Sequence, residues 1–409
     1  MKRLLTAALA TVVGLAMATS AFATDTRINS LSGGEKAFTV HDSANIYVLP
    51  QYMVNYKNSV DVDATNGATY GTMNIRYALS DDSVLLLFGK SSPWESVVST
   101  KSLGGANPAT AAGFTPGSAD PTNHQFGIGF GMKASESMRV GATLSFGASR
   151  NDGDGTNQNN NKFFDLNTGL GLDLNETNSL DFGLNLRFGT FSDVKGTQGD
   201  MFIPDGIFGL GLLAKGEFQV HQIAKVVPYF AFDYDTRGVA HAFRQDTTGA
   251  ETQRGKLNTT TVSLGADLAI TPVEGVLVQP GLGLSYVGTV LDGNSAAGAQ
   301  ALTIEDSSAL VPFYGFAAEA KAFDWMTLRL GARQTIVKTS FANTMTPPAT
   351  NESHTSGVLN TVCVGAGFQL MGWNLDLNVN PAFINNGIDA VSGTPTAGFA
   401  TDFALSYDW

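Results

Sequence analysis

Five histidines are the side chains of this chain best suited to acid–base chemistry near neutral pH. None shares a stretch of one face with a serine and a carboxylate, and the H-E-x-x-H spacing of a zinc enzyme is absent. The sequence therefore predicts that the chain is not an enzyme. The histidines are His41, His124, His221, His241 and His354.

The sequence also offers few residues for thiol chemistry or for binding a metal. Cys363 is the only cysteine, which excludes a disulfide framework and a thiolate metal site. The stretch 151–157 places carboxylates at alternate positions as a calcium loop does, but Lys162 and Phe163 stand where the twelve-residue pattern needs its distal Glu. We interpret this stretch as a solvated loop, and we expect neither a metal nor a cofactor.

The composition narrows the class of protein. Charged residues are only 15% of the 409, hydrophobic residues are 43%, and there are 26 phenylalanines, which excludes an intrinsically disordered chain. Because 36 acidic residues outnumber 24 basic ones, we expect no nucleic-acid partner.

The beginning of the chain has the order of a secretory signal peptide. Lys2 and Arg3 precede an apolar stretch over 4–18, and Ala21 and Ala23 occupy the −3 and −1 positions of a cleavage site. We therefore predict a signal peptide over 1–23, followed by a periplasmic or lumenal N-terminal segment over 24–44.

The rest of the chain alternates apolar and polar residues with period two, the pattern of strands with one apolar face. Two places are less regular, because 84–88 is apolar throughout and Leu213 breaks the pattern of its segment. The sixteen predicted strands lie near 45–56, 68–79, 83–90, 124–133, 138–149, 163–174, 179–191, 206–218, 226–237, 257–270, 276–289, 309–321, 325–336, 357–370, 373–382 and 398–409.

Short and long connections alternate between these strands. Short turns on one side and long loops on the other are typical of an up-and-down barrel in a bacterial outer membrane, and an even strand count places both termini in the periplasm. The sequence therefore predicts an all-β fold, a transmembrane up-and-down antiparallel barrel over 45–409, with fourteen strands as the fallback. A soluble β protein is the alternative. The predicted short connections lie at 80–82, 134–137, 175–178, 221–225, 271–275, 322–324 and 371–372.

Aromatic residues gather where the rims of such a barrel would meet the membrane interfaces. Trp325, Trp373 and Trp409 map to the rim with the short turns, and Tyr234 and Tyr286 map to the opposite rim. Because amphipathic rings favour the interface, we predict that these five side chains form its aromatic girdles.

The last predicted strand ends in alternating apolar residues. Phe403, Leu405, Tyr407 and Trp409 share one parity, and Trp409 ends the sequence. This ending resembles the C-terminal sorting and insertion signal of Gram-negative outer-membrane barrels. The resemblance implies the barrel-insertion machinery as a partner and outer-membrane lipid as the surroundings.

Charged side chains on the other parity would face a water-filled lumen. Across a narrow pore such charges sort solutes by sign, so we interpret them as channel-lining residues. The alternative is that pairs such as Glu319 with Arg329 or Arg333 only brace the wall. The longest connection, 91–123, is expected to fold into the pore. The predicted channel-lining residues are Arg76, Arg139, Arg187, Arg329, Arg333, Asp165, Asp173, Asp233, Asp267 and Glu319.

A sixteen-stranded barrel leaves an aqueous lumen, so the first functional expectation is a porin-like channel for passive diffusion of small polar solutes. Its selectivity should lean weakly to cations, because acidic residues outnumber basic ones. The sequence leaves open whether the lumen is open or plugged, and whether the chain forms oligomers.

The segment 37–50 carries a second hypothesis. It resembles the N-terminal hatch of the long-chain fatty acid transporter family, in which a similar run leads into an Asn-Pro-Ala motif before the first strand. Leu49-Pro50-Gln51 stands at that place here, so only Pro50 matches, and the family has fourteen strands. The resemblance implies transport of hydrophobic compounds. A third hypothesis is a non-conducting barrel that displays its loops.

Overall fold

A computed structural model gives the fold of most of the chain. It describes residues 25–32, 39–40, 42–65, 70–92, 123–151, 157–195, 200–201, 205–241, 253–294, 302–345, 349–379 and 400–409. The predicted signal peptide and nearly all of the predicted inward-folding loop lie outside these residues.

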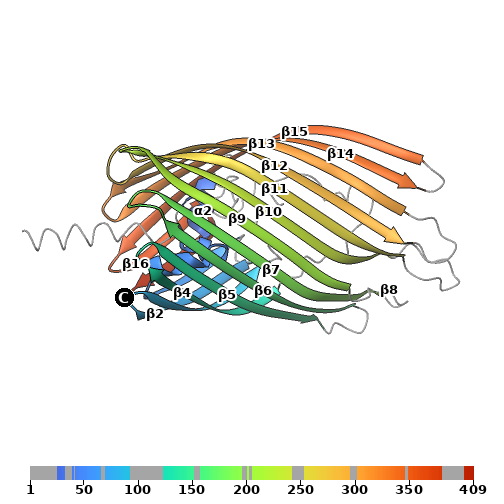
Figure 1. Cartoon of the computed structure of the whole chain (residues 1–409), viewed down its shortest axis with the longest axis horizontal. Coiled ribbons are helices and arrows are strands. Elements are labelled where there is room, and N and C mark those ends of the chain that lie inside the picture. Colours follow the sequence, from blue (N-terminus) through green and yellow to red (C-terminus); the bar gives the residue numbers. More distant parts are fainter. Residues whose placement is uncertain are drawn as a thin grey trace, which may run out of the picture.

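The described residues form a closed antiparallel barrel of sixteen wall strands (Figure 1). Neighbours in sequence are neighbours in the sheet, and β17 pairs with β1 from Ser59 opposite Asp408 onward, which closes the ring. An additional two-residue strand, β8 (Asp200–Met201), pairs only with the end of β7. The sixteen are β1 (Ser59–Thr65), β2 (Tyr70–Ser80), β3 (Ser83–Ser92), β4 (Asn123–Ser135), β5 (Met138–Asn151), β6 (Asn157–Asp173), β7 (Ser179–Lys195), β9 (Asp205–His221), β10 (Ala224–His241), β11 (Gln253–Ile270), β12 (Val276–Asn294), β13 (Leu302–Phe323), β14 (Met326–Met345), β15 (Ala349–Leu370), β16 (Trp373–Val379) and β17 (Ala400–Asp408).

The end of the barrel that holds the C-terminus also holds the short turns (Figure 1). These turns agree with the predicted short connections, and the start of β1 lies at the same end because it pairs with the end of β17. The even strand count and the placement of both barrel ends on one side are thereby confirmed. The turns lie at 81–82, 136–137, 174–178, 222–223, 271–275, 324–325 and 371–372.

The strand predicted over 45–56 is wrong. These residues form two 3₁₀ helices, η1 (Ser43–Tyr47) and η2 (Pro50–Asn55), and the first strand of the wall is β1. Pro50 cannot donate to a strand ladder but suits the first position of a helix. Both parities also carry large apolar side chains, Leu49 and Met53 on one and Val48 and Tyr52 on the other, and all four are buried, which does not fit a wall strand with one face toward lipid.

The outer face carries the apolar band of a membrane-spanning barrel. On β14, Leu328 and Leu330 point outward and are 46% and 42% exposed, while the alternate residues Arg329 and Gly331 are buried. The same outward apolar face appears on β4, where Ile128 and Phe130 are 46% and 42% exposed. The described strands therefore form a β-barrel with the outward apolar face of a membrane-spanning protein.

Stacked aromatic rings mark the turn-side rim of this band. Trp325 stacks on Phe323 and Phe368, with ring centroids 5.5 and 6.1 Å apart. Trp373 packs on Tyr407 at 4.7 Å, and Trp409 stacks on the other side of Tyr407 at 6.4 Å. On the loop side, Tyr234 is half-buried and Tyr286 is exposed on the outward parity.

No helix among the described residues is long and apolar enough to cross a membrane.

Candidate functional site: a two-part plug in the lumen

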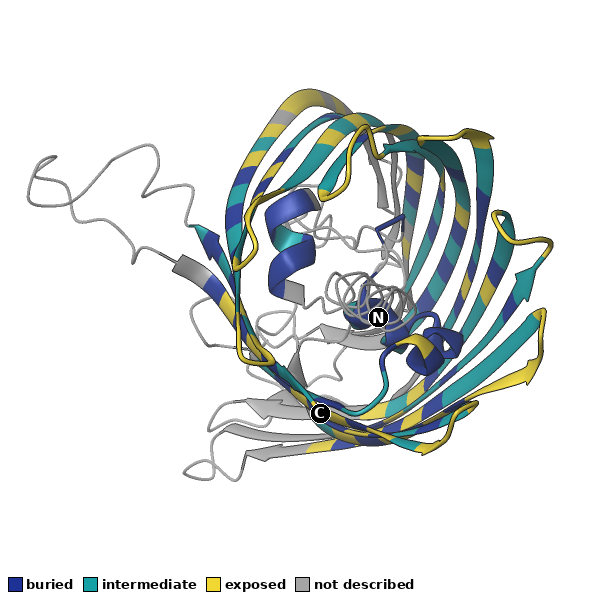
Figure 2. Cartoon of the chain, turned by 90° about the vertical axis from the view of Figure 1, so that its left-hand side faces the viewer, coloured by how far each residue is buried: buried dark blue, intermediate teal, exposed yellow. Residues whose placement is uncertain are grey.

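The N-terminal part of the chain lies inside the barrel. Figure 2, viewed from the end with the C-terminus, shows the described helices within the ring of strands. The helix α2 (Asp25–Ser32) lies against β13 to β17 and β1, whereas η2 lies against β3 to β6. We call α2 the polar half of the plug and 42–58 the apolar half. The two halves therefore occupy two separate arcs of the inner wall.

Glycines on the inner wall make room for both halves. At Gly141, a side-chain Cβ would overlap the backbone carbonyl of Pro50 in the apolar half. At Gly331, a Cβ would overlap the carbonyl of Leu31 in the polar half. Since a backbone cannot give way as a flexible side chain does, each half approaches the wall at a position where only glycine fits.

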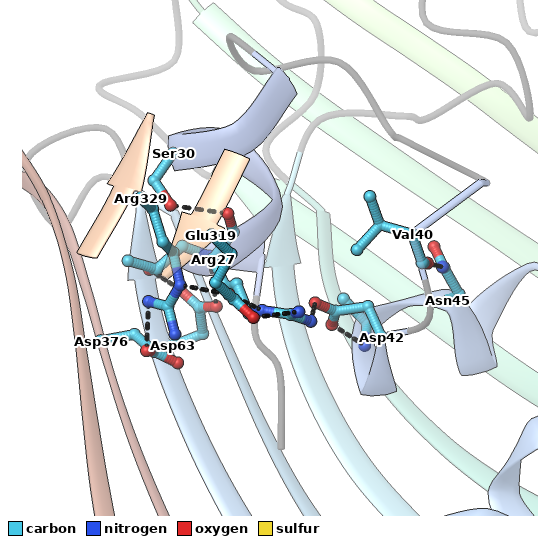
Figure 3. Close-up of polar contacts among 11 residues, drawn as sticks. Arg27, Ser30, Val40, Asp42, Asn45, Asp63, Glu319, Arg329 and Asp376 are labelled. Carbon is cyan, nitrogen blue, oxygen red and sulfur yellow. Dashed lines mark hydrogen bonds and ion pairs between the residues drawn. The ribbon is translucent and has the colours of Figure 1, made fainter. Parts of the chain in front are cut away.

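A chain of ion pairs fastens the polar half to the wall (Figure 3). The Arg27 guanidinium donates from Nε and Nη2 to the two carboxylate oxygens of Glu319, at 2.7 and 3.0 Å, and from Nη1 to Asp42 Oδ2 at 3.2 Å. Arg329 donates to the same Glu319 at 2.8 Å and to Asp376 at 2.5 Å. The five side chains thus alternate in sign from the apolar half, through α2, into β13, β14 and β16.

Three further hydrogen bonds, from Thr26 and Asn29, hold α2. Thr26 donates its backbone N–H and its hydroxyl to the carboxylate of Asp63 on β1, at 3.1 and 2.9 Å. Asn29 donates to Asp402 on β17 at 3.2 Å. Burial disfavours the Arg27 charge, but the carboxylates of Glu319 and Asp42 outweigh this and raise the pKa of the guanidinium above its ordinary value.

The apolar half packs into a hydrophobic cluster on the wall. Its side chains contact inward-facing residues of β3, β9 and β10, and Tyr47 at its edge packs against Phe88 with ring centroids 5.1 Å apart. Such a cluster inside a barrel lumen excludes water from one arc of the wall. Its buried members are Ile46, Val48, Leu49, Tyr52, Met53 and Tyr56 from the plug, with Val84, Leu86, Phe88, Leu213 and Ala231 from the wall.

One polar contact lies within this apolar half. The Tyr52 hydroxyl donates to Asp181 at 2.7 Å and accepts from the Lys215 ammonium at 3.0 Å, and Gln51 donates to the same Asp181 at 3.1 Å. Burial raises the pKa of the Tyr52 phenol well above its ordinary value, and the nearby Asp181 carboxylate raises it further. Tyr52 therefore stays neutral and anchors η2 to β7 and β9.

The residues predicted to line a channel all stand on the inward parity of their strands, but many are engaged in the wall. Arg187 lies opposite Gly209, which lies opposite Asp235, so the guanidinium crosses over β9 to reach β10. It pairs there with Asp233 at 2.8 Å and Asp235 at 3.4 Å, and it is 1% exposed. The sequence alternative of Glu319 bracing Arg329 is also present in the geometry.

The remaining predicted lining residues have partners as well. Their described contacts are Arg76 with Asp61, Arg139 with Asp173 at 2.7 Å, Asp165 with Asn167 at 3.2 Å, Asp267 with Gln279 at 2.9 Å and with Thr39, and Arg333 over the Phe313 ring at 4.0 Å. Whether any of them borders a constriction stays a prediction. At the C-terminus, Phe403, Leu405 and Trp409 point outward as predicted for an insertion signal, whose role also stays a prediction.

Sequence reasoning missed Arg27, Asp42, Tyr52 and Asp63, the side chains that hold the plug. One signal was available. The irregular segment 84–88 is apolar on both parities because its inward side chains pack on the plug. Leu213 breaks its strand pattern for the same reason.

Within the described ranges, no group of three or more His, Cys, Asp and Glu side chains is placed to hold a metal ion.

Comparison with protein-family models and with curated proteins gave no match. Among solved structures, the chain is similar to a Pseudomonas aeruginosa FadL homologue, at 12% identity and a TM-score of 0.45, covering 93% of this chain and 97% of that one. It is similar to the ferric-catecholate import receptor Fiu from E. coli K12, at 9% identity and a TM-score of 0.41, covering 86% and 74%. It is also similar to the translocator domain of the autotransporter NalP from Neisseria meningitidis, at 14% identity and a TM-score of 0.35, covering 67% and 89%. These likenesses concern the fold alone.

Proposed function

We propose that this barrel is a gated channel for small polar solutes, closed at rest by its N-terminal plug. The observation that carries the proposal is that both plug halves contact the inner wall at glycines. A Cβ at Gly141 or at Gly331 would overlap the plug backbone. Because the wall is shaped to fit the plug, we infer that the plug serves to close the lumen. We propose that the chain acts as a channel and not as an enzyme.

The character of the inner wall supports a polar solute. Neighbouring strands present hydroxyl and amide groups to the lumen, such as Ser263 with Ser285 at 2.7 Å and Asn185 with Asn167 at 2.6 Å. Sixteen strands enclose enough space for an aqueous path once the plug is displaced. Among the described strands, buried acids outnumber buried bases. The open path should therefore favour cations weakly, and salt near 0.1 M should screen most of that preference beyond ~10 Å.

Single-channel recording in planar bilayers tests this function. The full-length chain should be closed most of the time, and a variant lacking 25–57, which keeps the Asn58 contacts to the wall, should show a large, long-lived and weakly cation-selective conductance. Heat-modifiable migration in gels checks that the variant has folded. A folded deletion variant that stays as silent as the full-length chain would contradict a gated channel.

Transport of hydrophobic compounds is the second candidate. It is supported by the resemblance of 37–50 to a fatty acid transporter hatch and by the apolar cluster inside the lumen, where Tyr47 meets Phe88 at the cluster edge. Saturable uptake of an apolar probe by reconstituted vesicles, together with silent bilayers, would favour this candidate over the polar channel. Silence in both assays would favour a barrel that displays its loops.

A further inference from the structure

The helix α2 is not a self-supporting element. It has only eight residues, Asp-Thr-Arg-Ile-Asn-Ser-Leu-Ser, and isolated helices shorter than about 12–15 residues are marginal in water. It buries two apolar side chains, Ile28 and Leu31, and neither belongs to the hydrophobic cluster of the plug. Besides these two side chains, its place in the lumen depends on the polar contacts of Arg27, Thr26 and Asn29.

Three of the carboxylates that contact α2 keep another partner when it leaves. Glu319 retains Arg329 at 2.8 Å, and Asp402 retains the Asn378 amide at 2.9 Å. Asp42 retains the backbone N–H of Ala44 at 2.8 Å, the capping bond of η1. Water can replace what α2 supplied, so its departure strands none of these carboxylates as an unpaired buried charge.

The apolar half is tied down at its end as well as along its length. Asn58, where the plug joins β1, accepts a backbone hydrogen bond from Trp409 at 3.1 Å and a side-chain one from the Ala78 N–H at 3.0 Å. It is thereby fastened to β17 and β2. The segment before it buries seven apolar side chains, and removing them together would expose the whole cluster to water. These are Ile46, Val48, Leu49, Tyr52, Met53, Val54 and Tyr56.

We propose that the gate has one moving part: α2 undocks from β13 to β17 and β1, while 42–58 stays seated against β3 to β10. Opening breaks the Arg27 contacts to Glu319 and Asp42 and frees the arc of wall that α2 covers. This inference rests on the proposed gated channel, because it names the part of the plug that regulates it.

Thiol labelling tests the motion without reference to conduction. In a Cys363→Ser background, Ile28→Cys and Met53→Cys form a matched pair, because the native side chains are 2% and 0% exposed and are unreactive while docked. We expect a maleimide–polyethylene glycol reagent to label Cys at 28 at least about tenfold faster, since labelling of a buried thiol follows local opening. Adding Arg27→Gln should accelerate labelling at 28 and leave labelling at 53 unchanged. Equal rates at the two positions would overturn the inference.

Disulfide locks link the motion to conduction. Thr26→Cys with Asp63→Cys joins α2 to β1, at a pair that is in hydrogen-bond contact in the native chain. Met53→Cys with Gly131→Cys joins η2 to β4, where a Cβ at position 131 would lie 3.0 Å from the Met53 Cβ. The first lock should abolish channel openings until it is reduced, and the second should leave them unchanged. The reverse pattern would overturn the inference. Fast labelling at 28 with silent bilayers in every variant would contradict the channel but keep the moving helix.

Discussion

The two halves of the plug are neighbours in sequence and dock in the same lumen, yet they are held by different forces. The polar half buries two apolar side chains and is fastened by charged and hydrogen-bonding groups. The apolar half buries seven. At about 1.5–3 kcal/mol for each fully buried apolar side chain, five more of them outweigh the contacts that α2 can offer. Position along the chain therefore says little about how firmly a segment is seated.

The ion pairs of the polar half fix the orientation of α2 more than they add to the free energy of its docking. A bidentate pair such as Arg27 with Glu319 fixes the orientation of α2, because both nitrogens must face the carboxylate. Its net contribution is modest, since water solvates both groups once they separate. A segment held in this way returns to one docked position but leaves it at low cost, which is what a gate requires.

The largest expected effect comes from removing a buried side chain of the apolar half, with the same kind of change in the polar half as the comparison. Leu49→Ala should lower the free energy of unfolding by about 2–5 kcal/mol, because it opens a cavity in the cluster. Ile28→Ala, at an equally buried position, should lower it by less than about 1 kcal/mol, because the loss cannot exceed the weak docking of α2. Urea titrations of the barrel in lipid vesicles measure both. Equal losses would break the distinction between the halves.

Strand periodicity predicted most of the barrel because a wall strand must show lipid one face and water the other. It failed at 45–56, where the plug buries apolar side chains on both parities. It also missed β1, a short strand whose inward positions carry Ser59, Asp61 and Asp63. Polar residues at alternate positions next to a turn resemble a loop as much as they resemble a lumen-facing strand.

The candidate site was less predictable, because its contacts join distant parts of the sequence. Arg27 and Glu319 are 292 residues apart, and no period or spacing relates them. The wall residues that contact the apolar half could be noticed in the sequence, because the apolar run at 84–88 and Leu213 interrupt the strand pattern. Those that hold the polar half could not, because Glu319, Arg329 and Asp376 on their own have the pattern of an aqueous wall.

A smaller effect tests how closely the apolar half fits its seat. Gly141→Ala places a methyl group against the Pro50 carbonyl and should lower the free energy of unfolding by about 1–3 kcal/mol, the usual range for overpacking. Gly357→Ala is the matched control, because nothing lies within 4 Å of its added Cβ, and it should leave the stability unchanged. The same urea titration compares them. Similar stability of the two variants would mean that the plug does not press on β5.

The smallest effect concerns the one polar contact of the apolar half. Tyr52→Phe removes the hydroxyl between Asp181 and Lys215 and should lower the free energy of unfolding by about 1–2 kcal/mol at pH 8. Burial raises the pKa of Tyr52 in the folded chain, so the neutral phenol is favoured there. Its contribution is fully present below the unfolded pKa of about 10 and is lost as pH rises toward the folded pKa.

The stability difference between wild type and Tyr52→Phe should therefore be constant up to about pH 10 and shrink above it. Lys215, Arg139, Asp181 and Glu217 also face this phenol, but they are present in both proteins, so the difference isolates Tyr52. Labelling at position 28 should not respond to this substitution, because α2 does not touch the Tyr52 contact. A difference that stays constant from pH 8 to 11 would mean that Tyr52 ionises freely, and that the apolar half is as open to water as the polar half.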